Sequence, residues 1–383
     1  MKKSEKSLLD SVTGGLLLHK GGEASIYLLN VGGAPYVLKW YNDGFSFNEN
    51  VIKNTNKLHI SGLYRIEEWG KRNESLYLVY DYVDGIPSDK LGVIPVAVAL
   101  VALRQVVATL SLLRKQGVSH GDLNPANVIF SGDGNELRTI LIDCGIVGPG
   151  ALSYAAPERF QGKLADEKSD LFSLGLLLYR WIAGEDLIKA DGYEAFAEQM
   201  TNIDSVNITE TLYAKGFFGT PEGAVQLAAL EPLWSGLLRS GLTERIEDFD
   251  ELDELLEIAL DKVVHGEIAL ANCVTQYAKS INRPDCDRNA VLKVPNRLEK
   301  DFPFAVHKKN NWLKWGALGV SILILALIVL LLSGGTMRFG IDATGDQLLK
   351  RSRVMETSTE TENTPVLKVD SLLLDLPVPA SEQ

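Results

Sequence analysis

The residue types best suited to chemistry lie in two short polar runs on either side of an apolar hairpin. The first run, HGDLNPAN, holds Asp122 and Asn127, and the second, LIDCG, holds Asp143. Phosphoryl transfer needs a carboxylate beside the acceptor hydroxyl and an amide oxygen on magnesium. Two apolar strands joined by the turn at residues 131–134 would bring Asn127 close to Asp143. These residue types are the ones that magnesium-dependent phosphoryl transfer requires.

A lysine and a pair of glycines nearer the N-terminus are candidates for holding phosphate. Lys39 lies in the apolar run PYVLKWY, and a lysine that faces inward is costly unless an anion meets it. Gly21 and Gly22 lie in KGGEASIYLL, where backbone amides can approach phosphate oxygens because no Cβ intrudes. A surface lysine on a strand and an ordinary hairpin turn would give the same patterns.

The elements that must position these residues change in type along the chain. Short runs of β-branched and aromatic residues separated by Gly, Asn and Asp predict strands near residues 25–30, 35–41, 63–69 and 76–83. Apolar spacing of three and four predicts helices near residues 98–117, 169–185 and 248–263. A small sheet layer followed by a larger helical part is an α+β arrangement.

The order of these motifs resembles the protein kinase superfamily, most closely the bacterial serine/threonine kinases, across residues 13–265. Two later motifs extend the resemblance: Ala156-Pro157-Glu158, and the run at residues 169–175 with the distant Arg245. The resemblance implies a two-lobed fold, with a small β-rich N-lobe and a larger helical C-lobe. It also implies that ATP and Mg²⁺ are used.

The resemblance assigns the chemical roles residue by residue. Lys39 would position the phosphates and Glu49, on the expected first helix, would orient Lys39. Asp122 would align the acceptor hydroxyl, and Asn127 and Asp143 would hold magnesium.

The nucleotide would be bound mainly by the N-lobe. Gly21 and Gly22 match the family's phosphate loop, and Ile26 would cover the adenine. The backbone around Asp81 and Val83 would form hydrogen bonds to the adenine edge.

Three departures from the family pattern concern activity. Asn124, a third candidate for the catalytic set, stands where these kinases usually place a lysine that meets the γ-phosphate, and it carries no charge. Gly121 stands where the family has an arginine that binds the phosphate of a phosphorylated activation segment. The family's outer loop glycines appear as His19 and Ala24.

Three functions follow from this pattern. The first is a kinase that transfers the γ-phosphoryl group of ATP to serine or threonine of a protein substrate that the sequence does not identify. The alternative is a pseudokinase that binds ATP or acts as a scaffold in signalling. A third possibility is a small-molecule kinase, against which the later motifs argue.

Composition and charge add a cellular setting. A net charge of −12 argues against a nucleic-acid partner, because phosphate neutralisation needs a basic surface. Residues 315–337 contain no charged residue, and a helix of about 20 such residues crosses a membrane. Lys308, Lys309 and Lys314 precede this run and favour a cytoplasmic N-terminal side.

The expected order of segments follows from these signals. We expect a single-pass protein of the cell membrane with its kinase-like domain in the cytoplasm and its C-terminal tail outside. The segments are a polar lead (1–12), the kinase-like domain (13–265), a juxtamembrane linker (266–311), a transmembrane helix (312–337) and a disordered tail (338–383).

Overall fold

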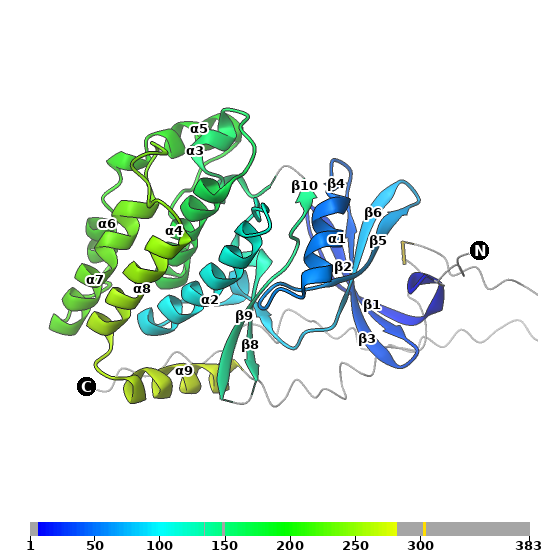
Figure 1. Cartoon of the computed structure of the whole chain (residues 1–383), viewed down its shortest axis with the longest axis horizontal. Helices are drawn as coiled ribbons and strands as arrows, with labels where there is room; N and C mark the ends of the chain where they lie inside the picture. Colours follow the sequence, from blue (N-terminus) through cyan, green and yellow to red (C-terminus); the bar gives the residue numbers. More distant parts are fainter. Residues whose placement is uncertain (1–6, 134, 148–149, 282–301, 304–383) are drawn as a thin grey trace, which may run out of the picture. The chain divides into compact units, whose positions relative to one another are not determined.

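The N-terminal part of the chain forms an antiparallel sheet in the order β1-β2-β3-β6-β5 (Figure 1). This computed structural model describes residues 7–133, 135–147, 150–281 and 302–303. The sheet and the elements around it are η1 (Leu9–Ser11), β1 (Val12–Lys20), β2 (Ala24–Val31), β3 (Ala34–Tyr41), β4 (Ser46–Phe47), α1 (Glu49–Leu58), β5 (Ile66–Arg72) and β6 (Ser75–Asp81).

The two faces of the sheet are both apolar but belong to different clusters. Successive side chains on a strand point to opposite faces, so Tyr27 and Leu38 lie on an outer face and Ala24 and Tyr80 on an inner one. Helix α1 covers the inner face through Ile52, which is fully buried. The inner face is the one that carries Lys39.

The C-terminal part is helical and begins with a small sheet. Its elements are β7 (Ile86–Pro87), η2 (Ser88–Lys90), α2 (Val96–Arg114), η3 (Pro125–Asn127), β8 (Val128–Asp133), β9 (Glu136–Leu141), β10 (Ile146–Val147), η4 (Leu152–Tyr154), α3 (Pro157–Phe160), α4 (Glu167–Ala183), α5 (Tyr193–Thr201), η5 (Ile203–Ser205), α6 (Ile208–Ala214), α7 (Pro221–Leu237), α8 (Phe249–Val263) and α9 (Glu267–Ile281). The two-lobed α+β architecture expected from the sequence is confirmed (Figure 1).

Helices α2 and α4 form the centre of the C-lobe. Leu103, Leu174 and Trp181 are almost completely buried there. Among the described residues, α2 is the one helix long and apolar enough to cross a membrane, but 67% of it is buried within the domain. It is therefore a core helix. The transmembrane helix expected at residues 312–337 lies outside the described residues.

The folded unit continues past residue 265. Helix α9 begins the segment that the sequence assigns to a linker, and it packs against α2, β8 and β9 (Figure 1). The hydroxyl of Thr275 donates a hydrogen bond of 3.1 Å to the carbonyl of Asn135, which fixes α9 to the β8–β9 hairpin.

Candidate active site

The lysine and the aspartate expected to share one triphosphate meet between the lobes. Lys39 pairs across the sheet with Ile26 on β2 and with Leu78 on β6, so its side chain lies on the inner face. Its Nζ forms an ion pair with Oδ2 of Asp143, and both side chains are largely shielded, with 14% and 4% exposed. Two groups separated widely in sequence therefore converge as predicted.

Asp143 is held in a special conformation at this point. Its φ of +67° lies in the left-handed region, which Asp tolerates better than most residues. The hydroxyl of Tyr80 donates a hydrogen bond of 2.5 Å to its Oδ1. Burial, followed by the negative charge of Asp143, raises the pKa of Tyr80 well above its ordinary value. Tyr80 therefore stays protonated and acts as a donor to Asp143.

The expected partner of Lys39 on the first helix lies elsewhere. Glu49 is in the first turn of α1, directly after the capping residue Asn48, and its side chain is 60% exposed. Its carboxylate accepts a 2.6 Å hydrogen bond from Lys53 one turn later. The Lys39–Glu49 pair expected from the sequence is not formed in this structure, because Lys39 pairs with Asp143 and Glu49 pairs with Lys53.

Hydrogen bonds within the loop at residues 120–127 hold the carboxylate of Asp122 in place. The amide nitrogen of Asn127 donates to the backbone oxygen and to Oδ2 of Asp122, at 2.9 and 3.1 Å. The carboxylate of Asp170 accepts the backbone N–H groups of His120 at 2.8 Å and Gly121 at 2.9 Å. Burial raises the pKa of Asp122, and the N–H of Ala151 opposes that shift.

The loop leaves little room for a side chain at Gly121. Gly121 has a φ of +79°, where a side chain is strained, and a Cβ there would lie 3.0 Å from that of Ala165. A larger residue would therefore disturb the backbone that Asp170 holds.

Both the oxygen and the nitrogen of the Asn124 side-chain amide form hydrogen bonds within the same loop. Its Oδ1 accepts the N–H of Ala126 at 3.0 Å, capping η3, and its nitrogen donates to the backbone oxygen of Asp122 at 3.2 Å. Asn124 therefore shapes the loop in this structure, and its part in catalysis stays a prediction.

Strand register brings the expected magnesium ligands together. Val128 pairs with Leu141, and the N–H of Ile142 donates to the carbonyl of Asn127 at 3.1 Å. Because the Asn127 amide nitrogen points to Asp122, its oxygen is the atom left to meet a metal beside the Asp143 carboxylate. One amide oxygen and one carboxylate fit Mg²⁺, which usually keeps several waters and takes its other ligands from phosphates.

The segment after Asp143 lies over the catalytic loop and also joins the N-lobe. Strand β10 pairs with β4, where Ile146 lies opposite Phe47, and the N–H of Asn48 donates to Gly145 at 2.8 Å. Further along, the N–H of Ala151 donates to Oδ1 of Asp122 at 3.2 Å. Both carboxylate oxygens of Asp122 thus accept hydrogen bonds from the chain itself.

The nucleotide-binding positions are arranged around the inner face. Gly21 and Gly22 form the turn between β1 and β2, where the N–H of Gly21 donates to Ala24 at 2.9 Å. Ile26 is half-buried beside Lys39, and its place over the adenine stays a prediction. At the edge of β6, the carbonyl of Asp81 accepts the hydroxyl of Tyr64 at 2.5 Å. Val83 follows this strand and is half-buried.

One charged residue in the turn was not identified from the sequence. Glu23 follows the two glycines, and desolvation, followed by the charge of Asp122, raises its pKa. Lys39 opposes this shift, so Glu23 belongs to the electrostatic surroundings of the site. An acidic residue directly after Gly22 was the one sequence feature that could have indicated this position.

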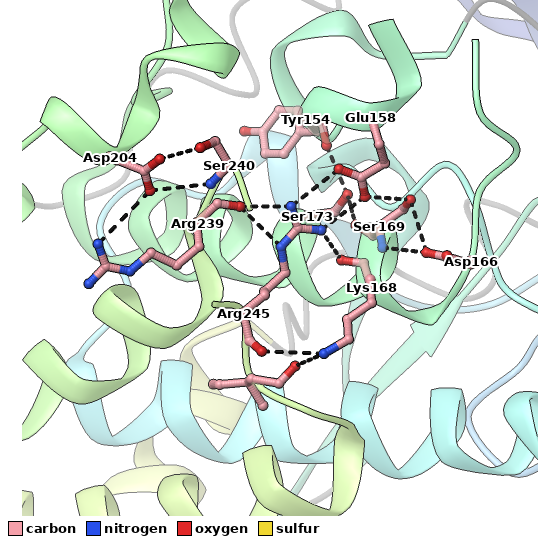
Figure 2. Close-up of polar contacts among 11 residues, drawn as sticks. Tyr154, Glu158, Asp166, Lys168, Ser169, Ser173, Asp204, Arg239, Ser240 and Arg245 are labelled. Atoms are coloured by element: carbon pink, nitrogen blue, oxygen red, sulfur yellow. Dashed lines mark hydrogen bonds and ion pairs between the residues drawn. The ribbon is translucent and has the colours of Figure 1, made fainter. Parts of the chain in front are cut away.

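A buried ion pair anchors the end of the activation segment (Figure 2). Arg245 has no exposed side-chain surface, and it contacts both carboxylate oxygens of Glu158 at 2.9 and 3.2 Å. Its guanidinium also donates to the carbonyls of Lys168 and Arg239, at 2.5 and 2.7 Å. The hydroxyl of Ser169 also donates a hydrogen bond of 2.9 Å to Oε1 of Glu158. The late pairing implied by the resemblance is present.

A pocket opens next to the catalytic carboxylate. It is lined by Asp122, by Leu152 of the activation segment, and by the aromatic residues Phe160 and Tyr193. The rings of Phe160 and Tyr193 lie 5.2 Å apart. An acceptor side chain that entered here would reach Asp122.

Comparisons with known proteins agree with this geometry. Residues 45–245 match the family described as the protein kinase domain. Serine/threonine-protein kinase pkn2 of Myxococcus xanthus is 33% identical over 139 residues, 31% of this chain and 17% of pkn2. Serine/threonine-protein kinase PknL of Mycobacterium tuberculosis is 26% identical over 165 residues, 39% of this chain and 41% of PknL.

A solved structure is similar as well. A crystal structure of the Mycobacterium tuberculosis PknI kinase domain is 20% identical, with a TM-score of 0.47, and the match covers 66% of this chain and 98% of that one. The chain spans less than half the length of the curated relatives named above.

Proposed function

This chain belongs to the protein kinase family, and from that premise we propose that it is a membrane-anchored serine/threonine protein kinase. The observation that carries the proposal is the convergence of Lys39 with Asp143 at the site where Asn127 orients Asp122. An amine, two carboxylates and an amide at one point suit the transfer of a phosphoryl group from Mg-ATP.

Each side chain has a task that its position permits. Lys39, on the inner face of the N-lobe sheet, would place its positive charge beside the phosphates. Asp122 accepts a hydrogen bond from the hydroxyl of the substrate. That hydroxyl would take the place of the Ala151 N–H, which now donates to Oδ1 of Asp122. Asn127 and Asp143 would hold Mg²⁺, which neutralises developing charge on the phosphates when it is bound.

Serine or threonine of a protein is the acceptor that the site suits. The related pkn2 and PknL are serine/threonine-protein kinases by name. The pocket beside Asp122 lies next to the Glu158–Arg245 ion pair, which belongs to the later motifs that the resemblance to protein kinases includes and that argue against a small-molecule kinase.

Membrane anchoring rests on sequence alone. The uncharged run at residues 315–337 is long enough to span a bilayer, and the lysines before it favour a cytoplasmic kinase domain. On this proposal, residues 338–383 lie on the outer side.

A transfer assay on the full chain in detergent tests the catalytic part. Wild-type protein with labelled ATP, Mg²⁺ and a generic protein substrate should yield phosphoserine or phosphothreonine, and Asp122→Asn should lower the rate at least about 100-fold. The matched control is Asp261→Asn, an exposed aspartate on α8, which should behave as wild type. ATP binding without transfer, unaltered by Asp122→Asn, would instead support the pseudokinase.

A further inference from the structure

The outer face of the N-lobe sheet contains a gap that an aromatic ring from the far end of the domain fills. Gly15 on β1 lies opposite Leu29 on β2, so a side chain at Gly15 would point to the outer face. A Cβ built there would lie 2.3 Å from Cε2 of Phe302, which therefore occupies that space. We call the surface formed by Gly15, Tyr27 and Leu29 the Gly15 notch.

The ring makes ordinary packing contacts in this notch. The ring centroids of Phe302 and Tyr27 are 5.0 Å apart and tilted by 59°, a favourable aromatic geometry. Phe302 packs on the outer-face cluster, in which Leu29 and Leu38 are fully buried. It therefore adds apolar cover to strands β1, β2 and β3.

A second contact fixes the backbone next to the ring. The amide nitrogen of Asn73, in the turn between β5 and β6, donates a hydrogen bond of 3.2 Å to the carbonyl of Pro303. Asn73 has a φ of +50°, a turn conformation that Asn adopts readily. The segment at residues 302–303 is thus held by an apolar contact and by a polar contact on separate parts of the N-lobe.

The chain length permits this return from the C-lobe. Helix α9 ends at Ile281 on the C-lobe, and residues 282–301 connect it to Phe302. A connection of this length can extend to about 70 Å, well beyond the size of a lobe. One continuous chain can therefore contact the C-lobe through α9 and the N-lobe through Phe302.

We propose that the Gly15 notch is a binding site for the chain's own linker, with the Phe302 ring and the Pro303 carbonyl as its ligand groups. Residues 302–303 then cover the outer face of the N-lobe sheet, although they follow the C-lobe helix α9 in the sequence. Glycine at position 15 is the specificity element, because any side chain there competes with the ring for the same space.

The test uses three variants of the full chain and compares their thermal midpoints. Phe302→Ala removes a packed ring and should lower the midpoint by about 3–6 °C. Gly15→Val should lower it to a similar extent, because the valine expels the ring. In the double variant, valine fills the space that the ring left, so its midpoint should lie no lower than that of Gly15→Val alone.

Hydrogen exchange shows which strands lose stability. It also tests the proposal if the thermal midpoint of a poorly folding variant cannot be measured. In Phe302→Ala, amides of β1 and β2 should exchange at least about three-fold faster, while those of α8 should not change. Gly219→Val is the matched control, since a Cβ at Gly219 meets nothing within 4 Å. Additive losses in the double variant, or unchanged exchange in β1 and β2, would overturn the proposal.

Discussion

Removing the guanidinium of Arg245 should be among the most damaging single changes in the C-lobe. Arg245→Met keeps the apolar length of the side chain but leaves Glu158 buried, at 4% exposure, without its positive partner. Burial alone would raise the pKa of Glu158, but the hydrogen bond and charge of Arg245 hold it below its ordinary value. Breaking such a buried pair costs about 3–5 kcal/mol.

The size of this effect can be measured directly. With about 2–4 °C per kcal/mol for a domain of this size, the thermal midpoint should fall by about 10 °C. The matched control is Arg104→Met, because Arg104 forms ion pairs with Asp253 and Glu257 at 39% exposure. Exposed pairs contribute about 0–1 kcal/mol, so this control should lose little stability.

A double variant separates loss of the pair from loss of packing. Glu158→Gln with Arg245→Met removes both charges, and should be less destabilised than the sum of the two single changes by about 2 kcal/mol. The reasoning is refuted if Arg245→Met loses less than about 1 kcal/mol, or if the two single effects simply add.

Two further predictions concern the active site. Tyr80→Phe removes the hydroxyl that competes with metal for Asp143, so Mg-ATP should bind up to about 10-fold more tightly by calorimetry; equal affinity would contradict this. Burial raises the pKa of Asp170 from 3.8 to about 6 despite the opposing charge of His120. The folded state then binds more protons than the unfolded state between these values, so raising the pH through this window should lower the free energy of unfolding by about 3 kcal/mol. Asp170→Asn should lack this dependence in denaturant titrations from pH 4 to 7, and an identical dependence in both proteins would exclude Asp170 as its source.

The main groups of the site could be predicted from sequence because their placement depends on local rules. Alternation along β3 decides the face on which Lys39 lies, and the hairpin between β8 and β9 decides that Asn127 lies near Asp143. Such rules involve only neighbours in one hairpin or one strand pair. The face on which Lys39 lies and the nearness of Asn127 to Asp143 follow from them. The convergence of Lys39 with Asp143, 104 residues apart, was instead expected only from the family resemblance.

Other features depend on contacts that no local pattern contains. Glu49 lies in the exposed first turn of α1 and pairs with Lys53, and its spacing from Lys39 in the sequence does not determine this placement. The strand expected at residues 63–69 begins at Ile66 instead, because Leu63 and Tyr64 contact Leu141 of the C-lobe. The Phe302 contact joins residues separated by most of the domain.

The short pairing of β4 with β10 couples the positions of the two lobes. Ser46 and Phe47 precede α1, whereas Ile146 and Val147 follow Asp143, so this ladder joins the two walls of the nucleotide cleft. Moving these two segments apart requires their backbone hydrogen bonds to break first. A ladder of only two residue pairs has few hydrogen bonds to break, so it can separate without either lobe unfolding.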